Sequence, residues 1–87
     1  MCGQTITSSV SGTVIRLENA GIIVIVATER GESFLDCNLG INLYIGVGDR
    51  VEVENAPFYI TNGRIVTVVE NDIVINGIHI TWKSVAR

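Results

Sequence analysis

The chain alternates short apolar runs with turns that contain glycine and asparagine, which is the pattern of a protein built from β-strands. Val51-Glu52-Val53-Glu54 alternates strictly, so its valines are expected to face inward and its glutamates outward. Residues 22–28 are apolar on both faces, as is typical of a strand buried on both sides. Further strands are expected at 13–17, 33–38, 64–69, 73–75 and 78–82. The pattern therefore predicts a small all-β barrel of about six or seven short strands.

Two Asn-Gly pairs mark tight turns in the carboxyl-terminal half of the chain. Asn76-Gly77 lies between two apolar runs and predicts a β-hairpin, because a type I′ turn needs positive φ at both central residues. Asn62-Gly63 predicts a second turn. Pro57 cannot donate to a sheet ladder, so residues 58–60 are expected to form a short extended piece or one turn of helix.

One domain accounts for the whole chain. Residues 1–11 are small and polar and predict a leader or a short edge strand. Residues 12–87 are expected to form the single barrel domain, with the carboxyl-terminal hairpin at 71–82. Valine and isoleucine supply 25 of the 87 residues and alanine only four, which excludes a coiled coil or a helical bundle.

Charge and motifs limit the chemistry that the chain is expected to perform. The formal net charge is −3, and the six basic residues stand singly, which argues against strong, salt-driven binding of nucleic acid. Cys2, Cys37 and His79 are too few and too scattered for a structural zinc site, so no metal or other cofactor is expected. The sequence contains no catalytic motif, so a non-enzymatic protein is expected. It also contains no apolar stretch long enough for a membrane helix, so the protein is expected to be cytoplasmic and not to associate with a membrane.

The region from Gly12 to Ile65 resembles bacterial translation initiation factor one, a family of small OB-fold proteins that bind RNA. The family pattern of Gly-Asp-Arg-Val, Val-Glu, Pro, Thr and Gly-Arg-Ile is matched, with its spacing, at Gly48-Asp49-Arg50-Val51, Val53-Glu54, Pro57, Thr61 and Gly63-Arg64-Ile65. The resemblance implies a five-stranded, OB-like Greek-key barrel. The Asn76-Gly77 hairpin would be an addition to that barrel, since the family lacks it.

The resemblance also implies RNA or the ribosome as partner and a nucleic-acid-binding face. Arg50 and Arg64 are the first candidates for phosphate contact, because they stand in the matched motif. The full set of candidate binding residues is Arg16, Tyr44, Arg50, Arg64 and Lys83. Convergence of these arginines and the lysine on one face would favour RNA binding, and dispersal would argue against it.

A purely structural role remains an alternative for these arginines and for the aromatic residues. Arg50 and Arg64 could instead pair with nearby carboxylates at the barrel surface, and the rings of Tyr44, Tyr59 and Trp82 could cap the ends of the barrel.

Two departures from the family favour a second function. Ile22 and Ile23 stand near the position where the family carries an aromatic platform for RNA, and residues 40–46 are uncharged where the family is rich in lysine and arginine. A module that binds another protein or associates with itself is therefore the alternative to nucleic-acid binding.

Overall fold

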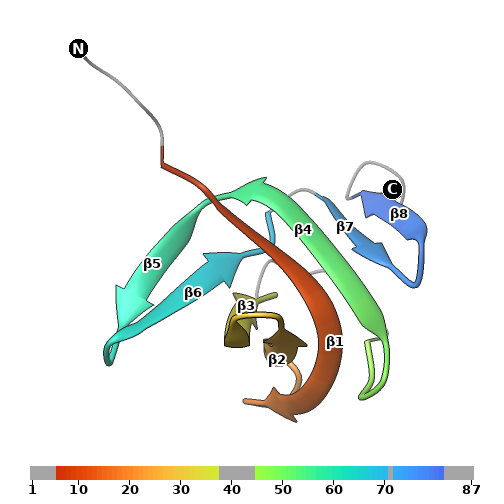
Figure 1. Ribbon diagram of the computed structural model, residues 1–87, viewed down its shortest axis with the longest axis horizontal. Helices are drawn as coiled ribbons and strands as arrows, with labels where there is room; N and C mark the ends of the chain where they lie inside the picture. Colours follow the sequence, from red (N-terminus) through yellow and green to blue (C-terminus); the bar gives the residue numbers. More distant parts are fainter. Residues whose placement is uncertain (1–5, 38–44, 71, 82–87) are drawn as a thin grey trace.

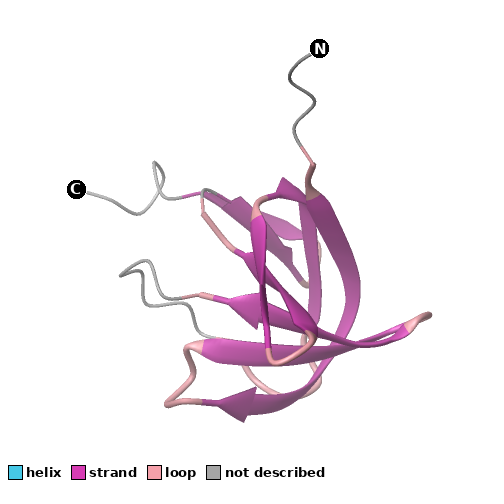
Figure 2. Ribbon diagram, turned by 90° about the vertical axis from the view of Figure 1, so that its left-hand side faces the viewer, coloured by secondary structure: helices cyan, strands magenta, loops and turns pink. Residues whose placement is uncertain are grey.

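The structure is a computed structural model that describes residues 6–37, 45–70 and 72–81. Those residues form strands and connecting loops with no helix (Figure 2). The eight strands are β1 (Ser8–Glu18), β2 (Ile23–Thr28), β3 (Gly31–Asp36), β4 (Arg50–Ala56), β5 (Phe58–Thr61), β6 (Arg64–Val68), β7 (Asp72–Ile75) and β8 (Ile78–Thr81). They form one mixed sheet in the order β5-β6-β3-β2-β1-β4-β7-β8. The all-β class predicted from the sequence is confirmed.

Strand β1 is the longest strand and is shared by two antiparallel partners. Its second half pairs with β2 from Thr13, opposite Ala27, to Glu18, and its first half pairs with β4 from Ser8 to Thr13. The register against β2 shifts between Val14 and Arg16, which indicates a β-bulge. A bulge increases the local twist, and β1 curves strongly along its length, with β4 beside it (Figure 1).

Beyond β1 and its partners, β6 lies beside β3, and the sheet has two edge strands. β3 and β6 are the parallel pair of the sheet, and Phe34 lies opposite Val66. Pro57 alone separates β4 from β5, and its carbonyl oxygen accepts a hydrogen bond of 2.8 Å from the amide of Val68. The hydrogen-bonded sheet does not close on itself, because β5 and β8 are its edge strands. The β5–β6 and β7–β8 hairpins project on opposite sides of the molecule (Figure 1).

The core is made mainly of valine and isoleucine side chains from one face of the coiled sheet. Alternation places these residues on the inner side of β1, β2 and β4, as the sequence pattern predicts. The buried cluster is Val10, Val14, Val24, Val26, Leu35, Val51, Val53, Ala56, Val69, Ile73 and Ile75. Thr67 is the buried polar residue among those described, and its hydroxyl lies 2.9 Å from the hydroxyl of Ser8. This contact satisfies a polar group that would otherwise be costly to bury.

Several boundaries differ from the sequence-based expectation. β1 begins at Ser8, so residues 8–11 belong to an interior strand, although they were expected in a leader or a short edge strand. Gly31 and Glu32, which precede the strand expected at 33–38, already pair with β2. The piece after Pro57 is strand rather than helix, because residues 58–61 pair with β6. The hairpin around Asn76-Gly77 is present as β7 and β8.

Gly12 is the position where β1 approaches β2 too closely for a side chain. A Cβ atom at Gly12 would overlap the carbonyl oxygen of Ala27 and lie 2.8 Å from Cγ1 of Val26. We expect Gly12→Ala to destabilise the fold by about 1–3 kcal/mol, because backbone atoms must move apart to admit the methyl group. Thermal unfolding monitored by circular dichroism measures the effect.

Gly46→Ala is the matched control for this substitution. A Cβ atom at Gly46 has no neighbouring atom within 4 Å. The control is expected to change the free energy of unfolding by less than about 0.5 kcal/mol. Equal stability of the two variants would contradict the close approach of β1 and β2 at Gly12.

Candidate functional site

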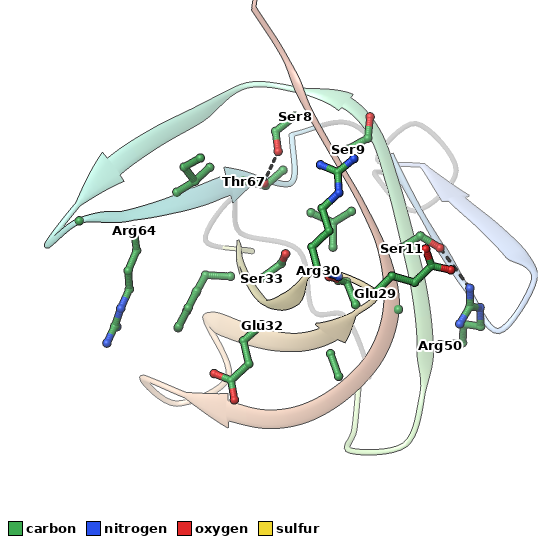
Figure 3. Close-up of a pocket in the computed structure, with 17 residues that line it drawn as sticks. Ser8, Ser9, Ser11, Glu29, Arg30, Glu32, Ser33, Arg50, Arg64 and Thr67 are labelled. Atoms are coloured by element: carbon green, nitrogen blue, oxygen red, sulfur yellow. Dashed lines mark hydrogen bonds between the residues drawn. The ribbon is translucent and has the colours of Figure 1, made fainter.

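The described residues form an open cleft of about 1110 Å³. Its walls are the first half of β1, the β2–β3 hairpin and the start of β6. Hydroxyl side chains supply much of the polar lining. They are Thr28 and the residues labelled in Figure 3 as Ser8, Ser9, Ser11, Ser33 and Thr67. The cleft therefore offers many neutral hydrogen-bonding groups on three separate segments of the chain.

Three arginines line this cleft. Arg30 lies in the turn between β2 and β3, Arg50 begins β4 and Arg64 begins β6. In Figure 3, Arg64 and Arg50 lie on opposite sides of the view and Arg30 lies between them. None of the three forms an ion pair with another residue that the structure describes. With Glu29 and Glu32 also in the lining, the cleft carries a small excess of positive charge.

The guanidinium of Arg64 lies over the aromatic ring of Phe34. The distance from the Arg64 Cζ atom to the ring centroid is 4.8 Å, within the range of a cation–π contact. Phe34 is held there by the sheet, because its direct neighbours on β2 and β6 are the buried residues Ile25 and Val66. Directly paired residues share a face of the sheet, so these three side chains form an apolar base beneath Arg64.

Arg50 is held at the edge of the cleft by a neutral partner. Its Nη2 atom donates a hydrogen bond of 3.2 Å to the Ser11 hydroxyl of the adjacent strand β1. The carboxylates of Asp49, Glu52 and Glu54, which were the alternative partners expected from the sequence, form no ion pair with it. The guanidinium therefore keeps most of its donors available to a ligand.

Asp49 of the Gly-Asp-Arg motif has a structural role in the turn before β4. Its Oδ2 atom accepts a hydrogen bond of 2.9 Å from the backbone amide of Gly46, and its Oδ1 atom accepts one of 3.2 Å from the side chain of Asn76. These two bonds, that from Gly46 first, lower the pKa of the Asp49 carboxyl. The motif that carries the family resemblance thus also builds the local fold.

Arg16 does not reach the cleft. It lies on β1 between two carboxylates, with its Nε atom 3.4 Å from Glu18 and its Nη2 atom 3.4 Å from Glu32. Hydrogen bonds to Glu32 and then to Glu18 raise the pKa of Arg16. Its charge is therefore already neutralised by neighbours of its own sheet.

Two of the five predicted binding residues come together, and two others are not described. Arg50 and Arg64 line the cleft, whereas Arg16 lies apart from it. Tyr44 and Lys83 lie outside the described residues. The predicted cations that can be located therefore converge only in part.

The sequence did not single out Arg30 or Phe34. Arg30 stands in a polar turn whose position over the cleft depends on how the β2–β3 hairpin bends. The alternation of β3 does put Phe34 and Asp36 on one face, but the partner strand β6 is fixed by a parallel pairing that leaves no local signal in the sequence.

Other polar side chains have local partners. The Tyr59 hydroxyl donates a hydrogen bond of 2.8 Å to Oδ2 of Asp36, and this bond raises the pKa of Tyr59. The Nε2 atom of His79 lies 3.5 Å from Asp72 on the β7–β8 hairpin, with both side chains half exposed. Within the described part of the chain, no three His, Cys, Asp or Glu residues lie together so as to hold a metal ion. The same residues include no helix able to cross a membrane.

Cys37 follows β3 and packs against the core cluster. Burial, and to a smaller extent the charge of Asp36, raise the pKa of its thiol to about 11. A thiol with that pKa is ionised in about one molecule in a thousand at pH 8, against roughly a quarter for an ordinary thiol.

Because the thiolate is the nucleophile, we expect iodoacetamide at pH 8 to modify Cys37 at least about 100-fold more slowly in the folded protein than in urea. Mass spectrometry of the peptide that contains Cys37 measures both rates, and similar rates would contradict the burial of this thiol.

Comparison with known proteins gives no further assignment. No protein-family model matches the chain, and no curated protein and no solved structure matches it.

Proposed function

We propose that this chain is a non-enzymatic OB-like module that binds single-stranded nucleic acid, RNA in the first place, in the cleft beside β1. The observation that carries the proposal is the composition of that cleft. It gathers three of the four arginines that the structure describes, six hydroxyl side chains and the Phe34 ring. This combination suits a ligand that presents phosphates, sugar hydroxyls and flat bases within a short distance.

Each part of the cleft matches one part of such a ligand. Arg30, Arg50 and Arg64 each carry a guanidinium group, and each group can donate two parallel hydrogen bonds to a phosphate. The hydroxyls of Ser9, Ser11 and Ser33 can contact phosphate oxygens and the ribose 2′-hydroxyl. The planar guanidinium of Arg64, held over the Phe34 ring, supplies a surface on which a base can stack. A single strand is favoured over a duplex, because only its unpaired bases can reach the floor of a cleft.

The strand connections support an OB-like arrangement of the sheet. β1 pairs with both β2 and β4, and β3 lies parallel to β6. If β4 and β5 are counted as one strand bent at Pro57, the arrangement is consistent with the five strands of a partly open Greek-key barrel, to which β7–β8 would be an added hairpin. In OB-folds, oligonucleotides bind on the face of the second and third strands, and the β2–β3 hairpin forms one wall of the present cleft.

Charge limits the affinity that this cleft can provide. The chain carries nine acidic and six basic residues, which gives a formal net charge of −3. Binding is therefore expected at the weak end of the range for non-specific complexes, with Kd values on the order of 10⁻⁴ to 10⁻⁵ M at physiological salt.

A salt titration of binding to a short single-stranded RNA tests the proposal. Three phosphate contacts predict that log K falls with log salt with a slope of about −2. Arg30→Ala, Arg50→Ala and Arg64→Ala should each weaken binding by roughly 3- to 10-fold at low salt and reduce the slope by about 0.7. Fluorescence anisotropy of a labelled oligonucleotide measures both quantities.

Arg16→Ala is the matched control, since it removes the same charge from a residue that lies outside the cleft. It should weaken binding by no more than about 2-fold, because Arg16 makes no contact with the ligand and its removal only leaves its partner Glu32, which lines the cleft, without a neutralising charge in exposed, screened surroundings. Absence of binding at low salt would refute the proposal, and so would an equal loss in Arg16→Ala and in the three cleft variants.

A second candidate function, self-association, is favoured by the β5–β6 hairpin. Ile60 and Ile65 are directly paired, and they are 66% and 54% exposed. β5 is an edge strand whose four residues, Phe58–Thr61, carry no charge. An uncharged, apolar edge can pair with the same strand of a second copy, because it lacks the charges with which edge strands usually prevent such pairing.

Light scattering over a range from micromolar to millimolar protein tests this candidate. Self-association through β5 predicts a dimer that Ile60→Lys abolishes, because two lysines would face each other across the new pair. Ile78→Lys is the control, since Ile78 is 65% exposed on the other edge strand, β8. A wild-type protein that stays monomeric throughout, or a dimer that only Ile78→Lys disrupts, would rule out association through β5.

A further inference from the structure

The turn of the carboxyl-terminal hairpin is bonded directly to the start of β4. The backbone amide of Asn76 donates a hydrogen bond of 2.7 Å to the carbonyl oxygen of Arg50. In return, the backbone amide of Arg50 donates one of 3.0 Å to the side-chain Oδ1 atom of Asn76. The Nδ2 atom of Asn76 donates a third bond, of 3.2 Å, to Oδ1 of Asp49. The side-chain oxygen, the side-chain nitrogen and the backbone amide of Asn76 are thus all bonded to two consecutive residues, Asp49 and Arg50.

Asparagine suits this position for a physical reason. Asn76 has a φ of 51°, in the left-handed region that asparagine tolerates better than most residues. With this backbone conformation, its side chain can imitate a strand residue, because it accepts the amide hydrogen of Arg50 while its own amide bonds to the Arg50 carbonyl. Arg50 is therefore paired on this side as if β4 had one more ladder position.

The second Asn-Gly turn of the chain shows that such bonding does not follow from the turn itself. Asn62 has a φ of 52° and precedes Gly63, so its backbone closely matches that of Asn76. Its side chain forms no hydrogen bond with another described residue. The three bonds of Asn76 are thus a property of its place beside β4.

We propose that Asn76 is a positioning residue for Arg50, through which the β7–β8 hairpin sets one side of the cleft. The inference rests on the proposed function, since Arg50 matters there as a contact to the ligand. With its backbone fixed on one side by Asn76, Arg50 reaches the Ser11 hydroxyl at 3.2 Å and presents its guanidinium in one place before the ligand arrives. A group ordered in advance loses less conformational freedom on binding, and the affinity is correspondingly higher.

A double-mutant cycle tests this role. Asn76→Gly keeps the left-handed turn but removes the side-chain bonds to Arg50 and Asp49. It should weaken binding of the same single-stranded RNA by roughly 2- to 10-fold in the wild-type background and leave the affinity of Arg50→Ala unchanged. Asn62→Gly makes the same replacement in the matched turn and should change the affinity in neither background.

Hydrogen exchange of the Arg50 amide gives a readout that needs no ligand. Asn76→Gly should accelerate exchange at Arg50 by at least about 10-fold, because its acceptor is lost, and Asn62→Gly should not. Unchanged exchange at the Arg50 amide would overturn the positioning role, whatever the result of the RNA-binding measurement.

The two experiments together separate the positioning role from the proposed function. If RNA binds but Asn76→Gly has no effect on affinity, or has the same effect in the Arg50→Ala background, the positioning role fails while the proposed function stands. If no RNA binds but exchange at Arg50 responds as expected, the proposed function fails and the anchoring of Arg50 by Asn76 is retained.

Discussion

The structure depends on the hydrogen bonding of one strand, β1, to two different neighbouring strands. β1 pairs with β4 along its first half and with β2 along its second half, and the two ladders meet at Thr13. The register shift between Val14 and Arg16 bends β1 where it passes from one partner to the other. Gly12 lies next to this junction, where the backbone of Ala27 leaves no space for a Cβ atom. The curvature of the sheet, and with it the enclosed valine and isoleucine core, follows from this arrangement.

The cleft is a consequence of the same constraint. Because β1 leaves β2 at Thr13, the end of the β2–β3 hairpin is not paired with β1, and Ser8, Ser9 and Ser11 of β1 line the cleft there. The start of β6 closes the far side and brings Arg64 over Phe34. Residues that are far apart in the sequence thus share one concave surface. The β7–β8 hairpin acts from outside this surface, through the bonds of Asn76 to Arg50 and Asp49.

Local patterns in the sequence were sufficient for the strands but not for the site. Alternation at 51–54, the apolar run at 22–28 and the Asn76-Gly77 turn each depend on neighbouring residues, and each predicts an element that the structure contains. The parallel pairing of β3 with β6 depends on residues about thirty positions apart, for which no short-range pattern exists. For that reason Phe34 and Arg64 were not expected to meet. Arg16 was expected to bind a ligand, but it is paired with Glu18, two residues along the same strand, and with Glu32 of β3, which becomes its neighbour only when the strands are paired.

The most direct test of this account is an NMR titration of uniformly ¹⁵N-labelled protein with a short single-stranded RNA at low salt. Binding in the cleft predicts that the largest amide shifts occur at Arg30, Ser33, Gly63 and Arg64, which lie on two hairpins that only the fold brings together. Amides of β8, on the far edge of the sheet, should hardly move. No shifts at low salt, or shifts centred on β7 and β8, would contradict the assignment of the cleft as the binding site.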